Sequence, residues 1–170
     1  MSVWRQLRAI GPLPVVATLV VPALILYLGA GPNVGFGLSL PVALLPAIAG
    51  AALIGGGLLL MYTTISLFAR VGQGTLAPWD PTRRLVVLGP YRHVRNPMIS
   101  GVMSILLGEG LLLGSSATLA WFSIFVALNA IFIPLFEEPD LARRFGDDYL
   151  DYRRNVPRWV PRLRAWTPDL

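Results

Sequence analysis

Two short polar stretches of this sequence hold the side chains best suited to chemistry. They are "GPYRHVRNP" and the "EE" pair of "FEEPD", and each adjoins a long apolar run. An arginine can bind a carboxylate or phosphate through two parallel hydrogen bonds, and a glutamate can bind an ammonium group. Arginine and glutamate side by side at a wet membrane edge therefore suit a zwitterionic ligand such as an amino acid. The candidate residues are Tyr91, His93, Arg95, Asn96, Glu137 and Glu138.

The two glutamates also have a structural interpretation. Adjacent carboxylates at the end of an apolar helix are costly unless they reach water or a cation, and the helix dipole adds to that cost. Glu137 and Glu138 are therefore either solvated, paired with Arg95 or Arg143, or bound to a cationic group of a ligand. Arg95 has the corresponding alternatives, an ion pair within the protein or the anionic group of a ligand.

Several weaker signals stay open. His93 is the only near-neutral titrating side chain, and it either holds its loop or acts as a base or ligand contact. Gly72 and Gly74 flank Gln73 in a pattern typical of turns, or of close backbone approach to a ligand. Glu109 lies deep in an apolar run, where we expect a structural role. The tyrosines expected to pack with a wet hydroxyl group are Tyr91, Tyr149 and Tyr152.

The composition is that of a membrane protein. Of the 170 residues, 55% are hydrophobic and only 14% are charged, whereas soluble domains are about one quarter charged. The length suits one compact domain. The absence of cysteine excludes disulfides and thiolate metal sites, and a single histidine argues against a zinc or copper centre. We therefore expect no metal.

Four apolar runs predict an all-α integral membrane protein with four transmembrane helices, at about residues 13–28, 41–69, 97–113 and 117–136. We expect the first run to be a retained span rather than a signal peptide. All 14 basic residues are arginines, and they lie before the first run, between the second and third, or after the fourth. The positive-inside rule then places both termini and residues 70–98 and 137–161 in the cytoplasm. Membrane topology thus explains the distribution of the arginines, and we expect no nucleic-acid partner.

The connections between these runs predict how the polar residues are positioned. Asn96-Pro97 is a typical helix start, since asparagine caps and proline suits the first turn. A very short turn at about 114–117 requires the fourth span to return antiparallel beside the third. Arg95 and Asn96 are then expected at nearly the same membrane depth as Glu137 and Glu138.

The residues after "FEEPD" predict an amphipathic helix that lies at the membrane interface. Trp159 and Trp166 follow among arginines, as expected of an interface anchor. The apolar residues that recur at helical spacing are Leu141, Phe145, Tyr149, Tyr152 and Val156.

"GPYRHVRNP" before a helical hairpin, followed by "EEPDLARRFGDDYLDYRRNVPRWVP", resembles the isoprenylcysteine carboxyl methyltransferase family and its phospholipid N-methyltransferase relatives. Members carry G-P-Y-x-x-x-R-[HN]-P, then a Glu-Glu pair and F-G-x-x-Y-x-x-Y-x-x-x-V-P. The resemblance covers about residues 72–161. Ile99 stands where a tyrosine is common, so acceptor specificity is not carried over.

The resemblance implies S-adenosylmethionine as cofactor, bound at the cytoplasmic end of the hairpin, in a bacterial inner membrane. The acceptor would be a lipid-like, prenylated or isoprenoid-type small molecule with a carboxylate or an amine. The cofactor carboxylate would meet Arg95, and its ammonium group would meet Glu137 or Glu138. On this interpretation Arg95→Ala and Glu138→Ala each abolish cofactor binding and leave the fold intact.

The resemblance also implies roles for the other candidates. Residues expected to line the cofactor pocket are Gly72, Gly74, Tyr91, His93 and Asn96, and residues that would close it are Tyr152 and Arg153. The catalytic set would be Arg95, Glu138 and Arg153. Two other classes remain open: a membrane sterol or enone reductase that uses NADPH, and a non-enzymatic membrane scaffold.

Overall fold

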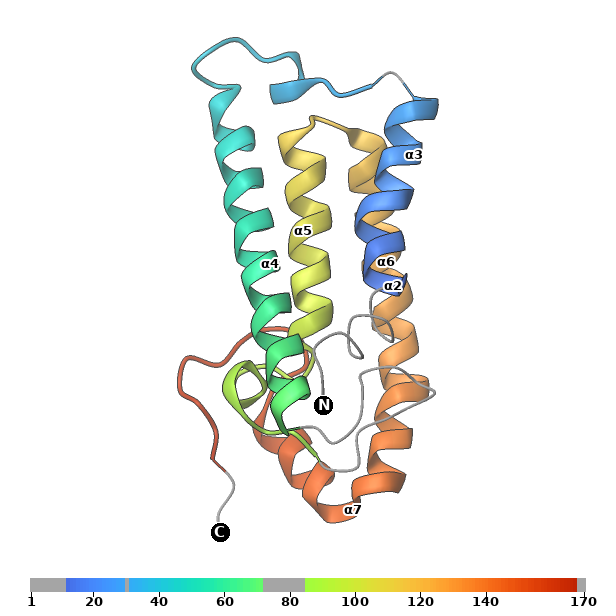
Figure 1. Cartoon of the computed structure of the whole chain (residues 1–170), viewed down its shortest axis with the longest axis vertical. Helices are drawn as coiled ribbons and strands as arrows, with labels where there is room; N and C mark the ends of the chain where they lie inside the picture. The colour runs from blue at the N-terminus through green and yellow to red at the C-terminus, as the bar shows by residue number, and fades with distance from the viewer. Residues whose placement is uncertain (1–11, 30, 72–84, 168–170) are drawn as a thin grey trace. The chain divides into compact units, whose positions relative to one another are not determined.

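The computed structural model describes residues 12–29, 31–71 and 85–167, which are helical with no strand (Figure 1). Two continuous helices each contain one wider π turn, because η1 joins α2 to α3 and η4 joins α6 to α7. The elements are α2 (Pro12–Val15), η1 (Val16–Val20), α3 (Val21–Leu28), η2 (Val34–Gly37), α4 (Leu44–Val71), η3 (Gly89–Arg92), α5 (Pro97–Leu112), α6 (Ser116–Phe132), η4 (Ile133–Glu137) and α7 (Glu138–Asn155).

Two of these helices are long and apolar enough to cross a membrane. One is Leu44–Leu67 within α4, and the other begins at Ser116. The apolar part of the second ends at Phe136, because Glu137 and the charged helix α7 follow. Val16–Leu28 and Pro97–Leu112 are apolar but shorter. The predicted all-helical class is thus confirmed for the described residues, and two helices are suited to a membrane span, while four spans and cytoplasmic termini remain predictions.

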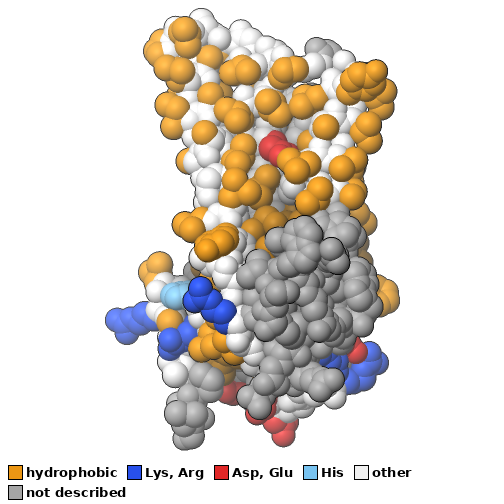
Figure 2. All heavy atoms as spheres, in the orientation of Figure 1, with side chains coloured by type: hydrophobic (Ala, Val, Ile, Leu, Met, Phe, Trp, Pro, Cys, Tyr) orange, Lys and Arg blue, Asp and Glu red, His pale blue; other side chains and the backbone are white. Residues whose placement is uncertain are grey.

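The chain divides into two compact units. The first, here called the apolar unit, comprises Leu13–Leu59 and Gly101–Asn129. The second, here called the charged unit, comprises Met1–Pro12, Leu60–Ser100 and Ala130–Leu170. In Figure 2 hydrophobic side chains are spread over the visible face of the apolar unit, which also shows an acidic side chain, and the visible arginines lie on the charged unit.

Glycines let α4 and α5 approach closely in the apolar unit, where Figure 1 shows them side by side. A Cβ added to Gly50 would lie 2.6 Å from the carbonyl oxygen of Gly108, and one added to Gly57 would lie 2.6 Å from that of Gly101. Ser104 Oγ donates a hydrogen bond to the Leu53 carbonyl at 2.8 Å. Small residues and a hydroxyl group are what close helix packing in lipid requires.

A tight turn joins α5 to α6, as the sequence predicts. Gly114 has φ +60°, and a side chain there would collide with the Asn33 carbonyl. Ser115 Oγ accepts hydrogen bonds from the Thr118 amide at 3.2 Å and the Thr118 hydroxyl at 2.9 Å. Ser115 therefore caps the first turn of α6, and the two helices return antiparallel to each other (Figure 1).

Glu109 is the only acidic residue in the sequence of the apolar unit. In the part of the chain that the structure describes, its Oε2 is buried and has no hydrogen-bond partner. Its expected structural role stays a prediction.

Two local irregularities shape the charged unit. Pro134 lies in the π turn η4, where the wider turn accommodates a residue that cannot donate to the helix ladder. Ile133 and Glu138 are buried, while Leu135 and Phe136 are 63% and 61% exposed. Within α7, Gly146 has φ 55° and ψ −132°, which bends the helix at a conformation that glycine adopts readily.

The bend lets the second half of α7 build the core of the charged unit. Tyr149, Tyr152 and Val156 are buried at 2%, 3% and 1% exposure. The residues packed against them are Leu85, Val87, Leu141, Ala142, Phe145 and Trp166. The predicted amphipathic helix therefore uses its apolar face to bind segments that precede α5 and follow α7.

Residues 156–167, here called the C-terminal strap, run back along the segment before α5. The Arg95 amide donates to the Pro157 carbonyl at 2.9 Å. Two more backbone hydrogen bonds continue the pairing, from Arg162 to His93 at 3.0 Å and from Trp166 to Arg92 at 2.9 Å. This pairing places the strap beside the motif "GPYRHVRNP".

Candidate functional site

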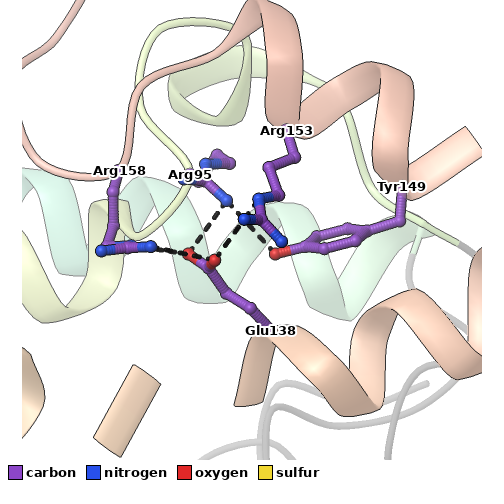
Figure 3. Close-up of polar contacts among 5 residues, drawn as sticks. All are labelled: Arg95, Glu138, Tyr149, Arg153 and Arg158. Atoms are coloured by element: carbon purple, nitrogen blue, oxygen red, sulfur yellow. Dashed lines mark hydrogen bonds and ion pairs between the residues drawn. The ribbon is translucent and has the colours of Figure 1, made fainter. Parts of the chain in front are cut away.

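A single buried carboxylate lies at the centre of the candidate site (Figure 3). The side chain of Glu138 is only 3% exposed, and it begins α7 directly after the π turn. The guanidinium group of Arg158, from the strap, holds it in bidentate fashion, with Nε 2.6 Å from Oε1 and NH2 3.0 Å from Oε2. Such paired, charge-assisted hydrogen bonds are among the strongest in proteins.

Arg95 approaches the same carboxylate from the segment before α5. Its NH1 lies 2.9 Å from Glu138 Oε1 and donates to the Tyr149 hydroxyl at 3.3 Å. The Arg95 side chain is 9% exposed. In the residues that the structure describes, its Nε is buried without a hydrogen-bond partner. A buried donor without an acceptor is costly, and a ligand anion would satisfy it.

Positive charge exceeds negative charge in this cluster. Arg153 adds a third guanidinium, 3.8 Å from Glu138 Oε2, and its side chain is 51% exposed. Three cations thus surround one anion. Burial alone raises the pKa of Glu138, but the hydrogen bonds from Arg158 and the charges of Arg95, Arg158 and Arg153 outweigh it and lower the pKa below its usual value. Glu138 is therefore ionised at neutral pH, and its oxygens are occupied by arginines.

Glu137 has a different environment. It is half-buried, and no ion pair to it exists within the described part of the chain. Burial, and then the charge of Glu138, raises its pKa. A cationic group near Glu137 would relieve both effects.

The segment Tyr91 to Arg95 is fixed by hydrogen bonds from α7 and the strap. The Tyr152 hydroxyl donates to the Tyr91 carbonyl at 2.7 Å. Burial, then the neighbouring Tyr152 and Glu137, raises the pKa of Tyr91. His93 Nδ1 lies 2.8 Å from the Arg162 carbonyl. Because a carbonyl only accepts, Nδ1 carries the proton, and Nε2 of a neutral His93 is left as an acceptor.

The structure brings together some of the residues singled out in the sequence. Arg95, Glu138 and Arg153 meet in one cluster. Asn96 lies next to Arg95, and its carbonyl accepts the Ser100 amide at 3.0 Å in the first turn of α5. Gly72 and Gly74 lie outside the described residues.

Arg158 is the member of the cluster that the sequence did not single out, and Tyr149 was expected only to pack. Arg158 follows Glu138 by twenty residues, and a bend of α7 and the turn into the strap separate them. No periodicity links such positions. The sequence signal that could have identified Arg158 is the acid at position 138. A buried carboxylate requires nearby cations, and the arginines after α7 were candidates for that role.

Comparisons with known proteins agree with the motifs. The family model described as phospholipid methyltransferase matches residues 45–148, which is more than half of the chain. Methanethiol S-methyltransferase 2 of Bradyrhizobium diazoefficiens is 41% identical over 80 residues, covering 44% of this chain and 28% of that protein. The chain thus spans less than a third of the length of this curated relative. No solved structure matches the chain.

The predicted resemblance is confirmed by these matches. The matched region contains α5, the short turn, α6, the π turn and the first part of α7. It therefore includes both Arg95 and Glu138, whose side chains meet in the cluster. The chain belongs to the phospholipid methyltransferase family, a family of membrane methyltransferases.

Proposed function

We propose that this protein transfers a methyl group from S-adenosylmethionine to a lipid-like acceptor, at the face of the membrane that bears its arginines. The observation that carries the proposal is Arg95, whose buried Nε has no partner in the described residues while its NH1 is held by Glu138. Membership of a methyltransferase family supports the class of reaction.

The residues of the cluster fit the charged end of this cofactor. Arg95, with its unpartnered Nε, would hold the carboxylate. Glu137, which has no ion pair within the described part of the chain, would hold the ammonium group. Glu138 would act as the buried counter-charge that orients Arg95, because Arg158 and Arg95 already occupy its oxygens. Gly72, Gly74, Tyr91, His93 and Asn96 remain proposed lining residues, and Tyr152 and Arg153 remain proposed closing residues.

When bound, the cofactor supplies a methyl carbon that its sulfonium group already activates. The protein's main tasks are then to position the acceptor and to exclude water. A carboxylate acceptor attacks as the anion and needs no base. An amine or a thiol must lose a proton, which Nε2 of neutral His93 or the carboxylate of Glu137 can accept.

The membrane setting and the similarity to one curated protein support the candidate acceptors. A lipid-like carboxylate or amine suits the proposed entry from the bilayer. The similarity to a protein named methanethiol S-methyltransferase adds a small thiol as a second candidate. These three nucleophiles are separable by direct assay.

The test measures thermal unfolding of the purified protein in detergent and in lipid nanodiscs. S-adenosylhomocysteine, S-adenosylmethionine and NADPH are added separately, since a ligand that binds the native state raises the midpoint. We expect a rise with the two adenosyl compounds and none with NADPH. A rise with NADPH alone would replace the proposal with a reductase, and no rise with any ligand in either medium would favour a scaffold.

Transfer is then measured with S-adenosylmethionine labelled in its methyl group. Fatty and isoprenoid carboxylates, aminophospholipids and small thiols are tested as acceptors. Label that appears in one class identifies the nucleophile. Binding of the cofactor without transfer to any class would limit the proposal to cofactor recognition.

A further inference from the structure

The C-terminal strap, residues 156–167, has both buried and exposed apolar side chains. Val156 is 1% exposed, and the ring of Trp166 lies 5.9 Å from that of Tyr152. Val160 and Leu163, by contrast, are 76% and 99% exposed. The two tryptophans are only partly exposed, so the outward apolar groups of the strap are aliphatic.

The strap and the last turn of α7 before it are strongly basic. Residues 152–167 contain five arginines and no acidic residue. In the described part of the chain, Glu138 is the only carboxylate within ion-pair distance of any of them, and it contacts Arg153 and Arg158. Arg162 donates to the neutral Asn155 carbonyl at 2.7 Å, and Arg154 and Arg164 are exposed. The exposed side chains of this segment therefore combine aliphatic groups with uncompensated positive charge.

The strap is attached where an apolar helix ends. Arg158 holds Glu138, which lies two residues after the exposed Phe136. Phe136 ends the apolar part of a helix long enough to cross a membrane. In a membrane protein, lipid headgroups lie where such an apolar run meets charged residues, and Val160 and Leu163 follow Arg158 by two and five residues.

We propose that the exposed side chains of the strap bind the surface of an anionic phospholipid leaflet, with Val160 and Leu163 inserted among the headgroups and Arg164 contacting lipid phosphates. Exposed aliphatic groups beside arginines are the pattern of interfacial membrane binding. An acidic protein partner would need carboxylates opposite the same arginines and an apolar surface opposite Leu163. The attachment beside the end of an apolar helix favours lipid. This inference is independent of the methyltransferase activity.

The absence of cysteine in the chain allows a direct test. Leu163→Cys is labelled with an environment-sensitive fluorophore, and the full-length protein is placed in nanodiscs of phosphatidylcholine, alone or mixed with phosphatidylglycerol. Because Leu163 is 99% exposed, the substitution removes no packing. Asp148→Cys, at an exposed acidic position of α7, is the matched control.

We expect the label at position 163 to shift to shorter emission wavelengths and to be quenched by headgroup-labelled nitroxide lipid, more strongly when phosphatidylglycerol is present. Adding Arg164→Glu should reduce the phosphatidylglycerol-dependent part only. The label at position 148 should show neither effect. Two outcomes would overturn the proposal. One is equal emission at position 163 in both lipids, without quenching. The other is a label that is shielded from water yet not quenched by lipid, because protein would then cover the strap.

Discussion

The guanidinium group of Arg158 meets the carboxylate of Glu138 edge to edge, with Nε 2.6 Å from Oε1 and NH2 3.0 Å from Oε2. Arg158 comes from the strap, and Glu138 begins α7. This pair therefore fastens the strap to the end of an apolar helix. Arg95 completes the arrangement from the segment before α5, so three parts of the chain depend on one acidic side chain.

Replacing Arg158 with alanine should destabilise the protein by about 1.5–3 kcal/mol, the usual contribution of a hydrogen bond to a charged group. The loss is limited because Arg95 stays beside Glu138. The measurement is thermal or denaturant unfolding in detergent. Arg154→Ala is the control, because Arg154 is exposed and makes no ion pair within the described residues. Equal stability of the two variants would contradict the structural role of the pair.

Replacing Glu138 with alanine should have a larger effect, about 3–5 kcal/mol, because it leaves buried arginine charge without a partner. From the sequence alone, this variant was expected to lose only cofactor binding. The arginine cluster changes that expectation, since Glu138 is 3% exposed and is contacted by three guanidinium groups. Unfolding of the variant measured without any ligand distinguishes a loss of stability from a loss of cofactor binding alone. A Glu138→Ala protein as stable as the unmodified one would restore the earlier expectation.

Glu137→Gln should weaken cofactor binding at least tenfold while leaving the unfolding midpoint of the ligand-free protein nearly unchanged. Glu137 is half-buried with a raised pKa, so removing its charge costs the fold little. Losing an ion pair to a ligand ammonium group corresponds to about 1.4 kcal/mol or more, a factor of ten. The readout is the concentration of S-adenosylhomocysteine that gives half of the maximal midpoint shift. Asp148→Asn serves as the control, and normal binding by Glu137→Gln would remove Glu137 from the proposed site.

Acid should destabilise the protein through Glu138. Its pKa in the folded protein lies below its usual value, so the unfolded state binds a proton first as the pH falls. The stabilisation is therefore complete above the usual glutamate pKa, about 4.3, and is lost as the pH falls through the folded pKa. Unfolding midpoints between about pH 3 and 7 should fall more steeply for the unmodified protein than for Glu138→Gln. Parallel curves would mean that another group governs acid stability.

Gly146→Ala should destabilise the charged unit by about 1–3 kcal/mol, because it forces alanine into a sparsely populated backbone region. Gly146 has φ 55° and ψ −132°, and beyond the adjacent backbone an added Cβ would meet no atom within 4 Å. Strain, rather than collision, is thus the cause. The matched control is Gly55→Ala in α4, where the added Cβ also meets open space and the position is within a helix. That variant should be neutral or more stable, and a similar loss in both would refute the strain argument.

Local signals predicted much of the helical structure. Pro97 begins α5, and the turn at Gly114 returns α6 antiparallel, because proline, glycine and capping residues act within a few positions of themselves. The hairpin then implied that Arg95 and Glu138 lie close, and they are 2.9 Å apart. Arg158 was missed because its contact with Glu138 depends on the bend at Gly146 and on the path of the strap. A backbone torsion angle and a long-range pairing leave no spacing pattern in the sequence.

The origin of Arg158 in the strap has a consequence for biosynthesis. The ribosome makes Arg95 first, then the helical hairpin, then Glu138, and Arg158 only afterwards. While Glu138 has been made and Arg158 has not, the carboxylate therefore lacks its closest counter-charge. The cluster is thus complete only after the strap has been made, and a chain truncated before residue 158 would leave Glu138 with Arg95 and Arg153 as its cations.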